Sequence, residues 1–142
     1  MGRQADCIFC KIVAGEIPSS KIAESPEACA FLDVGPVAEG HALVVPRNHY
    51  GTLAEMPPEE VAAVFRLAAR IAPVLREAVG AEGVNLLLND GRCAGQLVGH
   101  VHVHLIPRRS GDGLGFAWPA HKAAPEALAR LARKIASSLD AS

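Results

Sequence analysis

The sequence predicts an α+β domain built on a mainly antiparallel β-sheet. Short apolar segments are bounded by turn residues, as expected for strands that follow one another through hairpins or loops. Two longer segments carry apolar residues at helical spacing and are separated from the strands along the chain. Successive strands with segregated helices favour an α+β architecture over alternating βαβ units.

The predicted strands are residues 28–33, 41–45, 84–88 and 99–106. Turn residues follow the first strand, and Asn89-Asp90-Gly91 is a strong turn signal after the third. Pro46 and Pro107 are expected to end the second and fourth strands, because proline cannot donate a hydrogen bond to a neighbouring strand.

A long helix is predicted to begin at Pro57-Pro58-Glu59-Glu60, since proline and acidic residues suit a first helical turn. Its apolar face comprises Val61, Val64, Phe65, Ala68, Ile71, Ala72, Leu75 and Val79. Gly80 is expected to end this helix, and Pro73 to kink it. A final helix is predicted from Pro125-Glu126, with Leu128, Leu131, Ile135 and Leu139 on one face.

The length and composition predict one domain over residues 1–142. The chain has 142 residues, half of them hydrophobic, and a net charge of -1. It lacks a basic block, so no nucleic acid polymer is expected as a partner. It also lacks a signal core and an apolar stretch of the roughly 20 residues that a spanning helix needs, so no membrane association is expected and a cytoplasmic location is predicted.

Three histidines alternate in the fourth predicted strand, at positions 100, 102 and 104. Alternate residues of a strand lie on the same face, so the three imidazoles are expected to point one way. Core packing is a poor explanation, because each buried imidazole brings nitrogen atoms that need partners. Two explanations remain open from the run alone: a metal site, or a nucleophilic histidine with neighbours that orient it and handle protons.

The loop before this strand contains Asn89-Asp90-Gly91 and Gly95-Gln96. Taken alone, these residues need be no more than a turn. Glycines also let backbone N–H groups approach an anion closely, and amide side chains bind phosphate oxygens without adding charge. Beside three histidines, the loop is therefore interpreted as a phosphate-binding element.

These segments together resemble the histidine-triad (HIT) superfamily over nearly the whole chain. The resemblance rests on Asn89-Asp90-Gly91, Ala94-Gly95-Gln96 and the run from His100 to Arg108. Residues 6–17, Phe31-Leu32-Asp33 and the segment from Gly40 to Pro46 are similar to further parts of the family pattern. The resemblance implies a HIT-like fold with a sheet of about five strands, one long central helix and a C-terminal helix.

The resemblance also implies an activity and a set of site residues. His102 would attack the α-phosphorus of a nucleotide conjugate, form a nucleotidyl-histidine intermediate and release a nucleoside monophosphate. His104 and His41 match catalytic or supporting histidines of the family. The matching substrate positions are Asp33 for ribose, Asn89, Gly95 and Gln96 for phosphate, and Ile8, Phe9, Phe31 and Val34 for a base pocket. Singly, each of these four apolar residues could equally belong to the core.

Cys7 and Cys10 have the spacing of half a zinc site. The resemblance supplies His49 and His100 as the two further ligands, which would make a closed, structural zinc site. A reduced thiol pair without metal is the alternative, and a redox pair lacks the expected βαβ context.

Some features leave the reaction and the partners open. Leu97 stands where some relatives carry a hydroxyl residue, which leaves the leaving group undecided between phosphoramidates and dinucleoside polyphosphates. A purine nucleotide or nucleotide conjugate and a homodimer are the partners that the resemblance implies. Ala117-Trp118-Pro119 is similar to a family segment that reaches across such a dimer.

A zinc-dependent hydrolase that uses the three histidines as metal ligands and a nucleotide-binding regulator with negligible turnover are the alternative functions.

Overall fold

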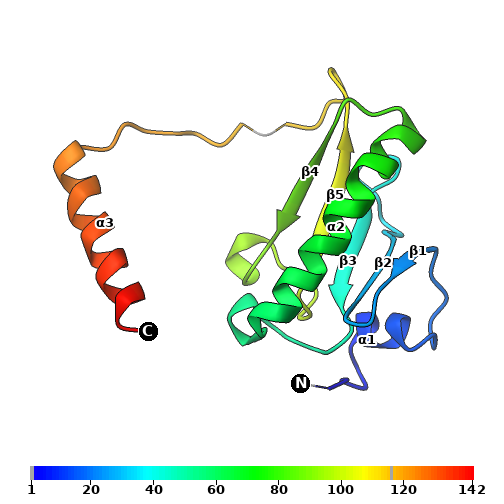
Figure 1. The fold of residues 1–142 in the computed structure, drawn as a ribbon. Coiled ribbons are helices and arrows are strands. Elements are labelled where there is room, and N and C mark those ends of the chain that lie inside the picture. Colours follow the sequence, from blue (N-terminus) through cyan, green and yellow to red (C-terminus); the bar gives the residue numbers. More distant parts are fainter. Residues whose placement is uncertain (1, 116) are drawn as a thin grey trace. The chain divides into compact units, whose positions relative to one another are not determined.

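The computed structural model describes residues 2–115 and 117–142. The chain forms two compact units, residues 1–112 and 113–142, and each is described by itself (Figure 1). The first unit contains α1 (Ile8–Val13), β1 (Lys21–Glu24), β2 (Ala28–Leu32), β3 (Ala42–Pro46), α2 (Pro58–Val79), β4 (Gly83–Leu88), β5 (Val103–Arg108) and the short 3-10 helices η1 (Leu53–Glu55) and η2 (Arg92–Ala94). The second unit contains α3 (Pro125–Asp140). Organisation of residues 1–142 as a single domain stays a prediction.

The strands form one sheet in the order β1-β2-β3-β5-β4, and every neighbouring pair is antiparallel. The predicted α+β class, with five strands, a long helix and a C-terminal helix, is confirmed. β5 joins the sheet between β3 and β4, with Leu43 opposite His104 on one side and Leu87 opposite His104 on the other. His104 therefore lies on an interior strand of the sheet, paired on both sides.

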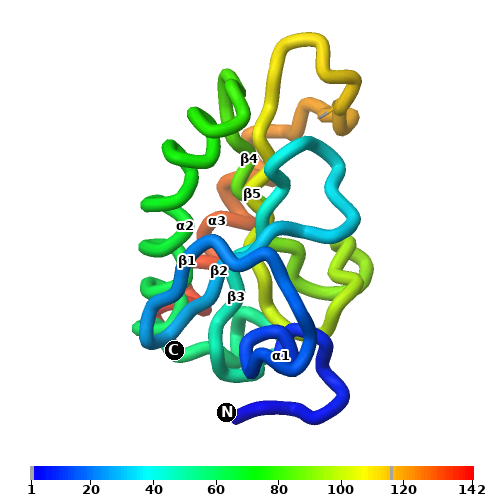
Figure 2. The backbone as a smooth tube through the Cα atoms, turned by 90° about the vertical axis from the view of Figure 1, so that its right-hand side faces the viewer, coloured from blue at the N-terminus to red at the C-terminus, as the bar shows by residue number. Residues whose placement is uncertain are grey.

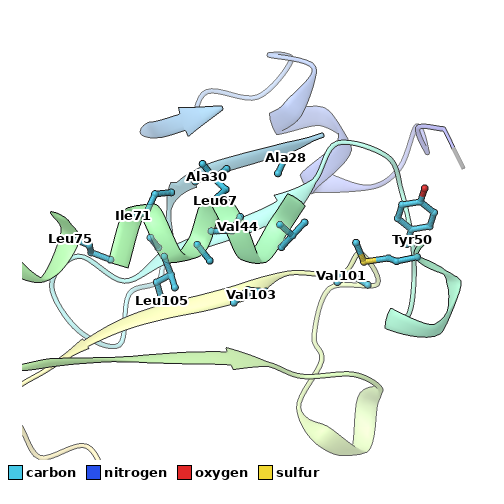
Figure 3. Packing of buried hydrophobic residues seen from close by; sticks show 14 residues of the cluster. Ala28, Ala30, Val44, Tyr50, Leu67, Ile71, Leu75, Val101, Val103 and Leu105 are labelled. Carbon is cyan, nitrogen blue, oxygen red and sulfur yellow. The ribbon is translucent and has the colours of Figure 1, made fainter. Parts of the chain in front are cut away.

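The two faces of the sheet carry different layers. The period of two along each strand sends alternate residues to opposite faces. On one face, side chains of β2, β3 and β5 pack against α2, as Ala30, Val44 and Leu105 show (Figure 3). On the other face, Cys29, Phe31, Leu43 and Val45 form a second cluster with side chains of α1. The backbone of α1 lies on the side of the strands away from α2 (Figure 2). The two helices therefore cover opposite faces, and His104 of β5 lies on the α1 face.

The predicted strand over residues 99–106 was wrong at both ends. The strand begins at Val103 and continues to Arg108, through Pro107. His100 and His102 precede it, because Val101 donates its N–H to the carbonyl of Tyr50 (2.8 Å) instead of joining a strand ladder. Pro107 is tolerated because β3 pairs only as far as Leu105, so beyond that point β5 has a partner on one side only.

The long helix α2 ends as predicted at Gly80, whose φ of 65° lies in the left-handed region that favours glycine. It continues through Pro73 as one helix of 22 residues. Neither β1 nor α1 was predicted from the sequence as a regular element.

In the second unit, α3 is amphipathic, and its four large apolar residues are between 52% and 69% exposed: Leu128, Leu131, Ile135 and Leu139. Across both units, no helix in the described part of the chain is long and apolar enough to cross a membrane.

Candidate active site

The histidine run alternates as predicted, although only His104 lies in a regular strand. Val101, Val103 and Leu105 pack into the core under α2. The imidazoles lie on the opposite face, where the ring of Phe9 meets those of His100 and His102 edge-on at centroid distances of 5.8 and 5.1 Å. The rings of His102 and His104 are 4.9 Å apart. Helix α1, which carries Phe9, thus forms one wall of the site.

His102 is oriented by the backbone of its own segment. Its side chain is 6% exposed, and Nδ1 lies 2.7 Å from the carbonyl oxygen of His100. A carbonyl can only accept, so Nδ1 carries the proton and the lone pair of the neutral ring is on Nε2. This is the form in which an imidazole can act as a nucleophile through Nε2.

His41 and His104 form a hydrogen-bonded pair, with 2.9 Å between Nε2 of His41 and Nδ1 of His104. Burial lowers the pKa of His104 to about 4, assisted by the nearby His102 and His41. Burial also lowers the pKa of His41, against an opposing effect of Asp33, whose carboxylate lies 3.6 Å away. Both imidazoles are therefore neutral near pH 7.

The loop between β4 and β5 is held by the amide of Gln96, which is 8% exposed. Its oxygen accepts the N–H of Gly91 (2.8 Å), and its nitrogen donates to the carbonyls of Gly51 (2.9 Å) and Val98 (3.1 Å). Gly95 has a φ of 100° and lies against Asn89, whose amide donates to the Gly95 carbonyl (3.4 Å). The loop thus brings the three predicted phosphate residues together, but the Gln96 amide is engaged inside the loop.

The predicted base-pocket residues separate into two kinds. Phe9 and Phe31 are buried and meet edge-on at 5.7 Å. Ile8 and Val34 are 46% and 96% exposed. Asp33, the predicted ribose residue, accepts the N–H of Gly35 at 2.8 Å through one carboxylate oxygen.

Cys7, Cys10, His49 and His100 converge, with their ligand atoms all within 4.8 Å of one another. Nδ1 of His100 is 3.4 Å from Sγ of Cys7 and 3.6 Å from Sγ of Cys10, and Nδ1 of His49 is 3.5 Å from Sγ of Cys10. Zinc bonds of about 2.3 Å to sulfur and about 2.0 Å to nitrogen, at a tetrahedral angle, place sulfur and nitrogen roughly 3.5 Å apart. The donor set and its spacing therefore fit a tetrahedral metal ion.

The tautomer of His100 is fixed by a hydrogen bond at the ring nitrogen that faces away from the cysteines. Nε2 lies 2.9 Å from the carbonyl of Pro46, so it carries the proton and Nδ1 keeps a lone pair. Burial lowers the pKa of His100 to about 4, which keeps the ring in the neutral form that binds metals.

The structure divides the histidine run, a division that the run alone left open and that the family resemblance implied. His100 turns to the cysteines, whereas His102 and His104 lie beside His41. Among the described residues, no cluster capable of holding a metal includes His102. The backbone groups that orient these rings are the N–H of Val37 at His41 and the carbonyls of Pro46 and His100. They were not anticipated, because any residue type supplies an amide or a carbonyl and the sequence gives no signal for them.

The site is therefore a histidine triad on an antiparallel sheet, with a Cys/His cluster beside it. The chain matches the family model of the HIT domain over residues 14–111 and belongs to that family. It is 42% identical to an adenosine 5'-monophosphoramidase of Schizosaccharomyces pombe over 134 residues, which are 94% of this chain and 98% of the relative.

Solved structures of related proteins agree with the assignment of this chain to the HIT domain family. This chain is 40% identical in sequence to a Streptococcus mutans protein of known crystal structure. The two structures superimpose with a TM-score of 0.92 over 97% of this chain and 88% of the other. A zinc-bound histidine triad family protein of Mycobacterium smegmatis shares 39% identity, with a TM-score of 0.74 and 96% of both chains covered.

Proposed function

We propose that this chain is a nucleotide hydrolase or transferase that cleaves nucleotide conjugates at the α-phosphorus, with Nε2 of His102 as the nucleophile. The observation that carries the proposal is the 2.7 Å bond from Nδ1 of His102 to the carbonyl of His100. It fixes the tautomer, and it also stabilises the positive charge that the ring gains when Nε2 bonds to phosphorus.

The reaction divides into two displacements. In the first, the lone pair on Nε2 of His102 forms a bond to phosphorus while the bond from phosphorus to the leaving group breaks, and the leaving amine takes a proton from water. In the second, water forms a bond to phosphorus, the bond to Nε2 breaks and the water loses a proton. A nucleoside monophosphate leaves, and His102 returns to its neutral form.

The neighbouring residues have supporting roles in this proposal. His104 lies on the same face as His102 and faces the phosphoryl group, and His41 supports His104. Asn89 and Gly95 lie on the loop that would receive the phosphate oxygens, and Gln96 shapes that loop through its three hydrogen bonds. Asp33 would accept hydrogen bonds from the ribose. The base would lie near the exposed side chains of Ile8 and Val34, with Phe9 and Phe31 behind them.

Among the conjugates, we infer that phosphoramidates are the preferred class. The S. pombe relative is named for that activity and matches this chain over nearly its full length. Leu97 offers no hydroxyl to a leaving group; its side chain is 95% exposed and borders a cavity of about 310 Å³ with Arg92, Gln96 and Gly99.

We also propose that Cys7, Cys10, His49 and His100 hold a zinc ion. The four protein ligands would close the coordination shell, so this ion would stabilise the fold and would not act on substrate. The M. smegmatis relative is described as zinc-bound. We further propose a homodimer, as the family resemblance implies.

Replacing His102 by alanine tests the proposed nucleophile. His102→Ala should lower kcat/KM for adenosine 5'-phosphoramidate by about four orders of magnitude or more, because the covalent route is removed. His121→Ala is the matched control, since this histidine is exposed and is not among the predicted site residues, and it should keep wild-type turnover. Wild-type turnover by His102→Ala would refute the assignment. Nucleotide binding without any turnover by the wild type would favour a regulatory function.

A further inference from the structure

The turn between β2 and β3 places one backbone amide against the histidine pair. The N–H of Val37 points at Nδ1 of His41, with 3.2 Å between the two nitrogens. A backbone amide can only donate, so Nδ1 of His41 must present a lone pair. In the neutral ring, the single proton of His41 is then on Nε2.

The position of the proton on His41 determines the position of the proton on His104. Nε2 of His41 lies 2.9 Å from Nδ1 of His104, so the proton on His41 makes Nδ1 of His104 the acceptor. The single proton of neutral His104 is then on Nε2. The low pKa values of both rings agree with this, because a protonated His41 would point a second N–H at the N–H of Val37.

Among the described residues, no other group lies within hydrogen-bond distance of the shared proton. The nearer carboxylate oxygen of Asp33 is 3.6 Å from Nε2 of His41, and the other oxygen is already held by the N–H of Gly35 at 2.8 Å. Within the described residues, Nε2 of His104 has no protein partner, and every buried side-chain nitrogen and oxygen described has one. Because Nε2 of His104 has no partner among these residues, it is not one of the buried atoms and is in contact with solvent.

We propose that the backbone amide of Val37 acts as a positioning group that sets the tautomer of His104 through His41. His104 then presents Nε2–H to the phosphoryl group as a neutral hydrogen-bond donor. The assignment of the protons rests on the resting structure alone, whereas the role toward a phosphoryl group rests on the function proposed above.

The tautomer has a consequence for the chemistry. A neutral imidazole that gave away its only N–H proton would become an anion, which is far too unfavourable near pH 7. His104 therefore stabilises charge on a phosphoryl oxygen by donating a hydrogen bond and keeps its proton. The proton that a leaving amine needs comes from water or another donor. The same turn carries Asp33, so one short segment would hold both the ribose and the histidine pair.

Nitrogen-15 NMR of the histidine side chains tests this assignment directly. In the full-length zinc-loaded protein without nucleotide, near pH 7, long-range proton–nitrogen spectra distinguish protonated from bare ring nitrogens. We expect Nε2 protonated and Nδ1 bare in both His41 and His104. A proton on Nδ1 of His104, or a cationic ring, would overturn the proposal. Because no substrate is present, this result is independent of whether the protein cleaves phosphoramidates.

Two pairs of variants test the path from Val37. The amide nitrogen of glutamine reaches the place of Nε2, whereas asparagine reaches only the place of Nδ1. His41→Gln should therefore keep the single Nε2–H form of His104, and His41→Asn should lose it to a mixture of tautomers. An Asn variant with the wild-type pattern would contradict the proposal.

The second pair changes the donor itself. Val37→Pro removes the N–H, and Val37→Ala keeps it. The proline variant should show mixed tautomers for His41 and His104, and the alanine variant should match the wild type. Folded Val37→Pro with an unchanged pattern would overturn the role of this amide. Should the proline variant fail to fold, the pattern of the two His41 variants decides.

Discussion

At the scale of single residues, a different group meets the ring of each histidine in the run: a backbone carbonyl at His100 and at His102, and the ring of His41 at His104. The carbonyl of Pro46 leaves Nδ1 of His100 free for the cysteines, and the carbonyl of His100 leaves Nε2 of His102 free. Each bond fixes one nitrogen as a donor and the other as a lone pair. Neighbouring histidines of one run thus obtain separate roles without any difference in residue type.

The depressed pKa of His104 predicts a dependence of stability on pH. The pKa falls from 6.5 to about 4 on folding, so between these values the unfolded chain binds the proton and the folded chain does not. The free energy of unfolding should therefore decrease as the pH falls from about 6.5 to about 4. Replacing His104 by glutamine removes this contribution, so urea unfolding of His104→Gln should show a shallower pH dependence than the wild type. Equal slopes would contradict the assigned pKa.

At the scale of elements, the Cys/His cluster links parts of the first unit that are distant in sequence. Cys7 caps the start of α1 and Cys10 lies within it, His49 follows β3, and His100 precedes the segment that carries His102. Because α1 also supplies Phe9 to the wall of the site, a metal in this cluster would stabilise the surroundings of His102, the proposed nucleophile.

Elemental analysis tests this link. The purified protein should contain about one zinc per chain, and Cys10→Ser should lose it, since three remaining ligands bind more weakly than four. Cys93→Ser is the matched control, because Cys93 is an exposed thiol outside the cluster, and it should keep its zinc. In hydrogen exchange, the amides of α1 should lose protection in Cys10→Ser, while those of α2 keep theirs. Unchanged zinc content in Cys10→Ser would contradict the proposed site.

The helices and strands differ in how well the sequence predicted their positions. The helix α2 and the strands β2, β3 and β4 have long or clearly apolar patterns, and their positions were predicted to within a few residues. By contrast, β1 is four residues long and largely exposed, and α1 is six residues long, so neither has room for a periodic pattern. The start of β5 was missed because a backbone bond to Tyr50 redirects the chain at Val101.

The groupings of side chains in the site were also only partly predicted from the sequence. Spacing predicted that Cys7 and Cys10 act together, and the family resemblance implied His49 and His100 as their companions; the structure brings the four together. Residue types and spacing alone could not predict the division of the run between two clusters, which only the family resemblance implied, because it depends on where β3 ends and on its carbonyl at Pro46. Nor could they predict that the Gln96 amide is occupied by backbone groups of its own loop.

At the scale of the whole molecule, the described chain leaves a large apolar surface on the second unit. The four apolar residues of α3 are each more than half exposed and follow one face of the helix: Leu128, Leu131, Ile135 and Leu139. A contiguous apolar stripe on a helix is typical of a surface that another protein surface covers. This agrees with the homodimer proposed for the chain.

Sedimentation equilibrium tests this proposal. The chain has a mass of 14.9 kDa, and the wild type should sediment with twice that mass. Replacing Leu131 and Ile135 together by serine should weaken the association at least about tenfold if α3 is part of the interface, because two large apolar contacts are lost. Arg133→Ser, on the polar face of the same helix, should leave the association unchanged. A monomeric wild type would contradict the homodimer.

The central claim is that Nε2 of His102 forms a bond to phosphorus. Mass spectrometry after rapid alkaline quenching of wild-type protein with adenosine 5'-phosphoramidate tests it most directly, since phosphorus–nitrogen adducts survive alkaline conditions better than acid. The account predicts an adenylyl group on the peptide that contains His102, assigned to that ring by fragmentation and absent from His102→Ala. An adduct on His104, or turnover that leaves no adduct on any histidine while His102→Ala remains active, would contradict it.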